Sequence, residues 1–149
     1  MNPYDAAPEL MQAMLELEKK VRESPLPTSL RHLMKTRASQ LNGCAYCIHM
    51  HTRDAREAGE SEERLSLLSA WRDSPLYSTR ERAALAWTEA LTLLADTHAP
   101  DDVYAELARE FSESERVQVT MVIVAINAWN RIAVGFRSVH PTNGARAEA

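Results

Sequence analysis

The feature that most constrains the fold is an apolar stretch near the carboxyl end of the chain. Between Val119 and Trp129, apolar residues fall on almost every side of a helix, whereas a surface helix carries them on one stripe. Such a helix belongs at the centre of a fold or in a subunit interface. Its polar residues Asn127, Asn130 and Arg131 are three and four positions apart, so they share one face. We interpret that face as a polar seam or an interface network.

The same stretch does not predict a membrane span. Its most apolar part, from Val117 to Ile126, is interrupted by Gln118 and Thr120 and is too short to cross a bilayer. The amino terminus has no basic segment followed by an apolar one, so no signal peptide is expected. The net charge is −4 without a Lys/Arg block, which makes nucleic acid and anionic membrane poor candidate partners. We therefore expect a soluble, cytoplasmic protein.

The rest of the chain also favours helices. It has only four glycines in 149 residues, and no long stretch alternates with the period of two that is typical of a strand. Helical spacing of apolar residues, with start and stop signals, predicts seven helices, at residues 8–22, 29–41, 44–58, 62–71, 79–94, 101–110 and 112–134.

Helix-capping signals support several of these boundaries. Ser61 is placed to cap one helix, and the pairs Ser78–Glu81 and Ser112–Glu115 have the spacing of capping boxes. We predict an all-α protein, a compact bundle of six or seven helices. Residues 1–140 should form one domain, and residues 141–149 a flexible tail.

The two cysteines of the chain, Cys44 and Cys47, are three positions apart, and His51 follows. A structural disulfide is rare in a reducing cytosol, so a close pair there indicates catalysis or metal binding. If the segment is helical, Cys47 and His51 lie about 40° apart around the axis, and Cys44 and His51 about 20° apart. The three side chains then share a stripe from which His49 points away.

This arrangement suits thiol redox chemistry. The thiolate is the nucleophile, and a helix N-terminus or a nearby imidazolium lowers the pKa of a cysteine. After one thiol has reacted with an oxidant, a partner three residues away can close a disulfide. A histidine beside them can take a proton from sulfur and return it to a leaving group.

Other interpretations remain open for these residues. The two cysteines could be ordinary core residues, and His51 could be a surface histidine beside an active dithiol. A zinc site is the third alternative, although a single Cys-x-x-Cys without a second ligand pair is weak evidence for it. Its ligands would be Cys44, Cys47, His51 and one of His32, His98 and His140. A thioredoxin-type site is disfavoured because no βαβ pattern surrounds the motif.

Three segments of the chain resemble one known family. They are the run Arg37 to Cys47 followed by His51, the stretch Glu81 to Ala90, and Asn127 to Arg131. Together they are similar to the alkylhydroperoxidase AhpD-like branch of the carboxymuconolactone decarboxylase family, over roughly residues 10–138. The combination Ser-Gln-x-Asn-Gly-Cys-x-x-Cys-x-x-x-His carries most of the likeness.

The resemblance implies an all-helical fold that assembles into trimers or hexamers. It also implies thiol-dependent reduction of a peroxide by a thiol or dithiol reductant, without metal, haem or another cofactor. Carried over onto this sequence, Cys47 attacks the peroxide, Cys44 resolves the intermediate, and His51 relays protons. The lactone-decarboxylase half of the family works without the cysteine pair, so the pair argues against that activity.

One family residue has no direct counterpart here. The family's relay glutamate stands twelve residues before the first cysteine, and that position is His32 in this chain. Glu81 is a candidate substitute because it heads a helix that could pack near the site, although its capping box with Ser78 also accounts for it. Glu89, two turns further on, is a weaker candidate.

These observations lead to one main functional prediction. We expect an enzyme, a thiol-dependent peroxidase or disulfide oxidoreductase, with Cys47, Cys44, His51, Glu81 and His32 as candidate catalytic residues. The alternatives are a redox-sensing or binding oligomer that performs no turnover, and a zinc-stabilised helical domain.

Overall fold

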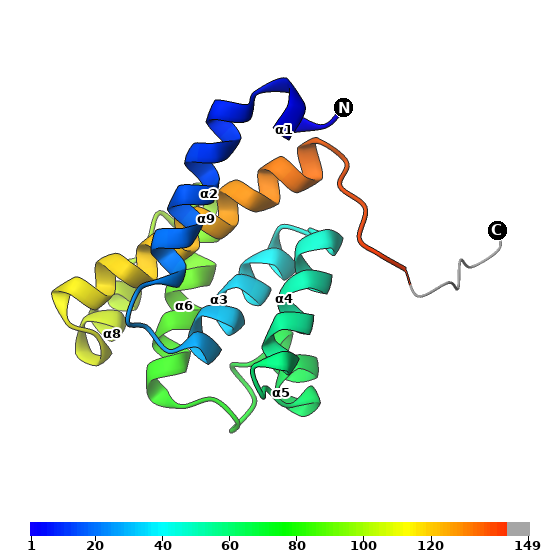
Figure 1. Ribbon diagram of the computed structural model, residues 1–149. Helices are drawn as coiled ribbons and strands as arrows, with labels where there is room; N and C mark the ends of the chain where they lie inside the picture. Colours follow the sequence, from blue (N-terminus) through cyan, green and yellow to red (C-terminus); the bar gives the residue numbers. More distant parts are fainter. Residues whose placement is uncertain (143–149) are drawn as a thin grey trace.

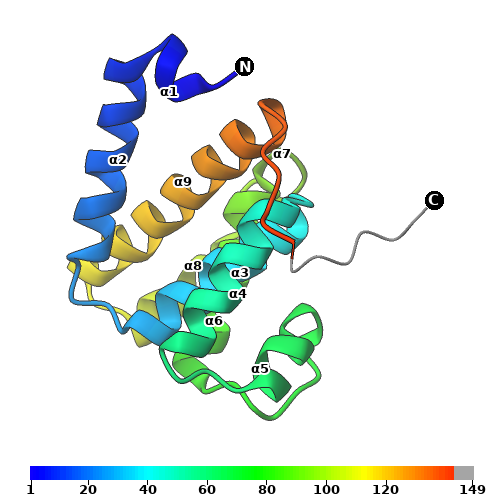
Figure 2. The ribbon, with the colours of Figure 1, turned by 45° about the vertical axis from the view of Figure 1, so that its right-hand side comes forward.

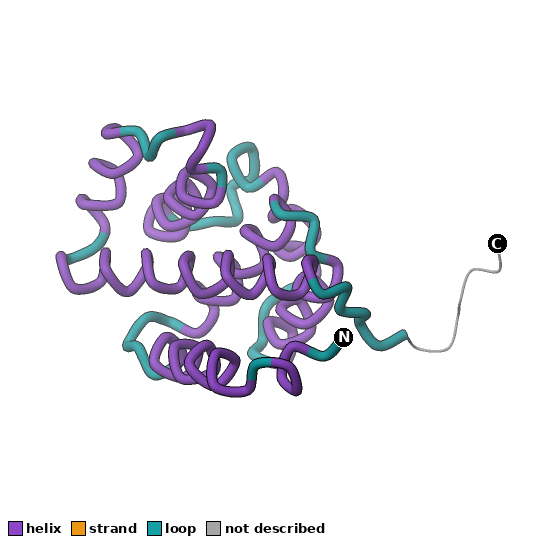
Figure 3. Tube along the Cα trace, turned by 90° about the horizontal axis from the view of Figure 1, so that it is seen from above, coloured by secondary structure: helices purple, strands orange, loops and turns teal. Residues whose placement is uncertain are grey.

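The computed structural model describes residues 1–142, and it contains helices and no strands within that range (Figures 1 and 3). The all-α prediction is confirmed. Of the expected tail, residues 143–149 lie outside the described residues.

Six of the seven predicted helices are single α-helices whose ends lie within a few residues of the expected positions. They are α2 (Pro8–Arg22), α3 (Thr28–Leu41), α4 (Ala45–Glu57), α6 (Thr79–Thr92), α8 (Asp101–Glu110) and α9 (Glu113–Gly135). The seventh is α5 (Glu62–Leu67), which continues as a 3₁₀ turn, η1 (Leu68–Ala70). Two short helices were not predicted, α1 (Pro3–Ala6) and α7 (Leu94–Thr97), because a single turn has no periodicity to detect.

The expected caps are present. The side chain of Ser61 accepts a hydrogen bond from the backbone N–H of Arg64 at the start of α5. Ser78 and Glu81 form a complete capping box on α6, and Ser112 with Glu115 forms another on α9. These bonds satisfy N–H groups that a helix leaves free at its first turn.

Helix α9 is the central element of the fold. It contacts α2 on one side and α3, α4 and α6 on the other (Figures 1 and 2). Val119, Val122, Ile123 and Ile126 are almost completely buried along it. The all-round apolar pattern therefore reflects a helix that packs against several neighbours within one chain.

By length and composition alone, α9 could also cross a membrane. The full helix has 23 residues, more than the apolar stretch singled out in the sequence. The core helix of a soluble protein meets the same criterion, and α9 contributes Val119, Val122, Ile123 and Ala125 to the main hydrophobic core.

Candidate active site

The site is built on the tight turn between α3 and α4. Helix α3 ends at Asn42, and Gly43 takes a left-handed conformation with φ +64°, which a residue without a Cβ adopts at little cost. The backbone N–H of Cys44 then donates to the carbonyl of Ser39 at 3.0 Å. This turn places the two cysteines at the start of α4.

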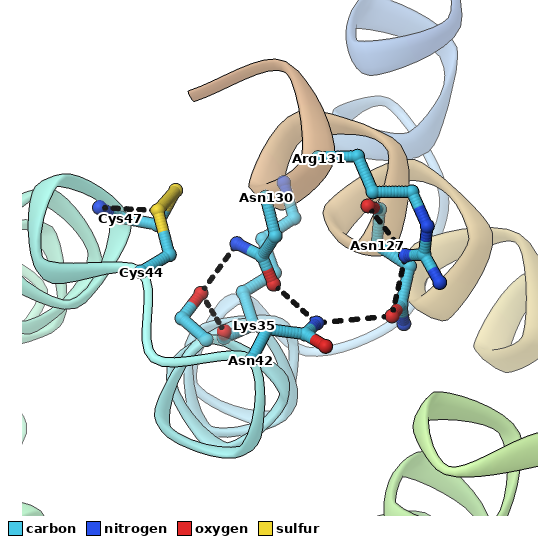
Figure 4. The surroundings of a disulfide bond; sticks show 8 residues. Lys35, Asn42, Cys44, Cys47, Asn127, Asn130 and Arg131 are labelled. Carbon is cyan, nitrogen blue, oxygen red and sulfur yellow. Dashed lines mark hydrogen bonds between the residues drawn. A yellow bond between two sulfur atoms is a disulfide. The ribbon is translucent and has the colours of Figure 1, made fainter. Parts of the chain in front are cut away.

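Side chains of α9 hold the turn in place (Figure 4). The Asn42 amide nitrogen donates to the side-chain oxygens of Asn127 and Asn130 at 3.0 and 2.8 Å. Asn130 donates in turn to Ser39 at 3.0 Å, and Arg131 donates to Asn127. Asn127, Asn130 and Arg131 therefore form a polar seam, one of the two interpretations offered for this face. Because Asn130 is 1% exposed, these bonds replace those it would make to water.

Cys44 lies just before α4 rather than inside it. It is the N-cap residue, with φ −85° and ψ 91°, and its Sγ accepts a hydrogen bond from the backbone N–H of Cys47 at 3.3 Å. The shared helical stripe expected from the sequence therefore holds for Cys47 and His51 only. A disulfide joins Cys44 to Cys47, whose Cα atoms are 5.3 Å apart.

Cys47 and His51 line a cavity of about 700 Å³, and Cys44 is not part of its lining. Its walls come from α1, α2, α3, α4 and the end of α9 with the segment that follows. Apolar and aromatic side chains form much of the wall, among them Tyr4, Leu15, Tyr46, Met50, Trp129 and Phe136. Of the two cysteines, Cys47 is therefore the one that faces a space in which a small molecule could bind.

His51 is placed to accept a proton in this cavity. It is 7% exposed, and neither ring nitrogen has a hydrogen-bond partner in the described part of the chain. Burial lowers the pKa of His51 to about 3, the positive charge of Lys35 lowers it as well, and Asp54 opposes both. The imidazole is therefore neutral at neutral pH and can act as a base.

His32 lies in the same cavity. It projects from α3 and is half-buried, and its Nδ1 has no partner among residues 1–142. Burial lowers its pKa below the ordinary value, against the effect of Asp54. The structure thus brings His32, His51 and Cys47 together.

The two candidate glutamates lie elsewhere, and neither lines the cavity. Glu81 accepts hydrogen bonds from Arg64 and from the backbone N–H of Ser78. Burial raises the pKa of Glu81, but these hydrogen bonds have the larger effect, so its pKa lies below the ordinary value. Glu89 is bound by Arg37, Trp71 and Arg72. Both carboxylates therefore have structural partners. For Glu81 the capping box with Ser78, which the sequence also indicated, is present.

His49 was expected to point away from the site, and the structure confirms this. His49 does not line the cavity and stacks on His140, with ring centroids 4.9 Å apart. Across the described residues, no group of three or more His, Cys, Asp or Glu side chains could hold a metal ion. The ligands considered for zinc are thus not gathered around one point.

A charged pair in the cavity wall was not predicted from the sequence. Lys35, on α3, forms an ion pair with Glu18, on α2, and both residues line the cavity. Lys35 stands three positions after His32 in a run of buried residues, and a charge at such a position signals a buried partner. Nothing in the sequence around Glu18 identifies it as that partner.

Comparison with known proteins agrees with the family resemblance seen in the sequence. The model of the carboxymuconolactone decarboxylase family matches residues 8–90. The uncharacterized protein YdfG of Bacillus subtilis (strain 168) is 42% identical over 131 residues, which cover 88% of this chain and 89% of that protein.

The solved structures with a similar fold include two that bear on function. One is a protein of unknown function from Agrobacterium tumefaciens that has been suggested to be the antioxidant defence protein AhpD. It is 48% identical with a TM-score of 0.93, over 96% of this chain and 98% of that one. The other is the debrominase Bmp8, 24% identical with a TM-score of 0.84, over 93% of this chain and 74% of that one. At that identity, the second likeness concerns the fold alone.

Proposed function

Because the chain belongs to the carboxymuconolactone decarboxylase family, with an AhpD-like fold, we propose that it is a thiol-dependent peroxidase. One observation carries this proposal. Cys47 and the neutral His51 line a common cavity, while Cys44 is bonded to Cys47 from outside that cavity. A nucleophile, a base and a second thiol are the groups that peroxide reduction by a dithiol needs.

In the first step, the Cys47 sulfur of the reduced protein attacks one peroxide oxygen. The O–O bond breaks, and Cys47 becomes a sulfenic acid while the peroxide is reduced to an alcohol. His51 relays the proton, accepting it from the Cys47 thiol at one ring nitrogen while the other ring nitrogen donates to the leaving oxygen, so the imidazole stays neutral. No external proton is required.

In the second step, the Cys44 sulfur attacks the sulfenic sulfur of Cys47. The new bond is the disulfide, and the hydroxyl group leaves as water with the proton from Cys44. The Cα separation of 5.3 Å lies within the range that disulfides require. A thiol or dithiol reductant then restores both thiols by exchange, which is the electron supply that the cycle needs.

The cavity favours an organic hydroperoxide over hydrogen peroxide. Its volume of about 700 Å³ lies in the range of small-molecule sites and far exceeds what one hydrogen peroxide molecule fills. Apolar side chains of the wall, such as Met50, Trp129 and Phe136, gain free energy by contact with an alkyl or aryl group. We therefore expect a higher kcat/KM for a bulky substrate.

The test is turnover of cumene hydroperoxide by the reduced protein with dithiothreitol in excess. We expect many equivalents of peroxide to be consumed per chain, no consumption by Cys47→Ser, and a trapped sulfenic acid after one equivalent in Cys44→Ser. Turnover that survives Cys47→Ser would refute the proposal. A single oxidation of the native protein without turnover would support the redox-sensing alternative.

We also propose that the protein works as a homo-oligomer, a trimer or hexamer, in the cytoplasm. Several large apolar side chains remain exposed on α9 and just after it, at Val117, Val124, Val134 and Phe136. Contiguous apolar patches mark contact surfaces, and Val117 and Val124, seven positions apart on α9, lie on one face of that helix. Sedimentation at micromolar concentration tests this, and a compact monomer would contradict it.

A further inference from the structure

Within residues 1–142, one ion pair has both members in the wall of the cavity: the buried Lys35 and Glu18, whose side chain is 19% exposed. Lys35 is 6% exposed, and such burial of a lysine is rare unless it is paired. One carboxylate oxygen of Glu18 accepts from the Lys35 ammonium, and the other is buried without a hydrogen-bond partner in the described part.

The pair shares its surroundings with the groups that exchange protons. Cys47, His32 and His51 line the same cavity as Glu18 and Lys35. After burial, the charge of Lys35 is the largest influence on the pKa of His51, and it lowers that pKa. Lys35, on α3, and the pair Cys47 and His51, on α4, therefore face the same cavity from two different helices.

His51 and His32 do not provide a permanent positive charge near the Cys47 sulfur. Burial and Lys35 together keep His51 neutral over the physiological range, and burial also lowers the pKa of His32. A thiolate in a buried position needs a nearby cation or helix N-terminus to form at neutral pH. The N-terminus of α4 contributes through the N–H of Cys47, but that group points to Cys44.

We propose that Lys35 is the cation that stabilises the Cys47 thiolate and that Glu18 is the positioning residue that holds Lys35 in the cavity wall and limits its effect. An ammonium has three N–H donors, of which Glu18 takes one, so two remain for the cavity. The same cation stabilises the negative charge that develops on the leaving oxygen. This inference rests on the proposed peroxidase function, because it assigns a role at the Cys47 thiolate.

Removing either charge of the pair should shift the pKa of the Cys47 thiol, in opposite directions for the two residues. Lys35→Met removes the cation but keeps the carboxylate, so the pKa of the Cys47 thiol rises. Glu18→Gln removes the carboxylate and leaves the cation uncompensated, so the pKa of the Cys47 thiol falls. Each shift should be on the order of one pH unit, the size that a neighbouring charge produces. In the double variant Glu18→Gln/Lys35→Met the two effects cancel, and the thiol pKa returns close to its original value.

The measurement is the ultraviolet absorbance of the thiolate as a function of pH, in a Cys44→Ser background where Cys47 is the sole thiol. The matching Cys44→Ser/Cys47→Ser protein supplies the baseline. Glu16→Gln and Lys20→Met, both exposed on α2, are the matched controls and should leave the thiol pKa unchanged. The neutral double variant keeps the test valid if a single variant folds poorly, because it buries no unpaired charge.

Opposite shifts in the two single variants, with cancellation in the double variant, support the proposal. Shifts of the same sign, or none in either single variant, overturn it, because a merely structural pair would lower stability without moving the thiol pKa in opposite directions. Failure of the proposed peroxidase function would be seen in a different measurement, as a protein of native sequence that consumes no peroxide. The thiol titration can be read in either case.

Discussion

His51 illustrates how a residue that we propose to relay protons can also lower the stability of the fold. Both of its ring nitrogens are buried without a partner in the described chain, and each such group costs on the order of 1–3 kcal/mol. A structural histidine would have its nitrogens bonded to neighbours. A neutral imidazole with free nitrogens facing a cavity is what a proton acceptor requires.

This burial makes the stability of the oxidised protein depend on pH. The pKa of His51 is about 3 in the folded chain and about 6.5 in an unfolded one. Between these values the unfolded state binds the extra proton. The free energy of unfolding therefore falls as pH decreases through this range, by up to about 1.4 kcal/mol per pH unit. Above about pH 6.5, the group makes no pH-dependent contribution.

Replacing His51 by leucine should remove that dependence. The free energy of unfolding is measured with urea for the oxidised protein and for His51→Leu between about pH 6.5 and pH 4. Plotted against pH, it should have a shallower slope in the variant, and the difference should correspond to as much as one bound proton. Peroxide turnover by the same variant should be lost. Equal slopes would contradict the buried neutral state of His51.

At the scale of elements, the start of α6 gives Glu81, a candidate catalytic carboxylate in the sequence, a structural role. Glu81 closes the capping box with Ser78 and pairs with Arg64, and it does not line the cavity. We expect Ser78→Ala and Glu81→Gln each to lower the free energy of unfolding by about 1 kcal/mol. Peroxide turnover should stay within about twofold, well below the tenfold that a 1.4 kcal/mol change in barrier gives. A large loss of turnover in a stably folded Glu81→Gln protein would return Glu81 to the proton relay.

Helix positions were predictable because apolar spacing and caps are local signals. Residues 8–22 and 101–110 were expected at the bounds that the structure shows for α2 and α8. Helix α1 and the 3₁₀ turn after Leu67 were not, because so few residues leave no periodic pattern. At Cys44, the motif was found but its backbone was taken as helical, since a cap and a first-turn residue look alike in sequence.

At the scale of the whole molecule, the prediction of the site was incomplete. Cys44, Cys47 and His51 belong to one short motif, and sequence alone located them. Glu18 was not found because its ion pair with Lys35 joins two different helices, α2 and α3. That contact depends on how α2 packs on α9. Relations between distant segments become visible only when the helices are assembled.

The cavity wall at the end of α9 makes a further prediction at this scale. Phe136 is 42% exposed and lines the cavity, so its truncation leaves the core intact. Phe136→Ala should lower kcat/KM for cumene hydroperoxide about tenfold, equivalent to about 1.4 kcal/mol of lost contact. The rate with hydrogen peroxide should change little. The matched control is Leu94→Ala, an exposed apolar side chain on α7 that does not line the cavity.

The walls of the cavity and the reactive motif come from different parts of the chain, and this separation has an evolutionary consequence. Cys44, Cys47 and His51 lie within eight consecutive residues, whereas α1, α2 and the end of α9 supply much of the remaining surface. Apart from Glu18, the side chains that these helices place in the wall can change while Asn127 and Asn130 go on holding the turn that carries the dithiol. A lineage built on this fold can therefore change the molecules that its cavity accepts while the Cys-x-x-Cys pair stays in place.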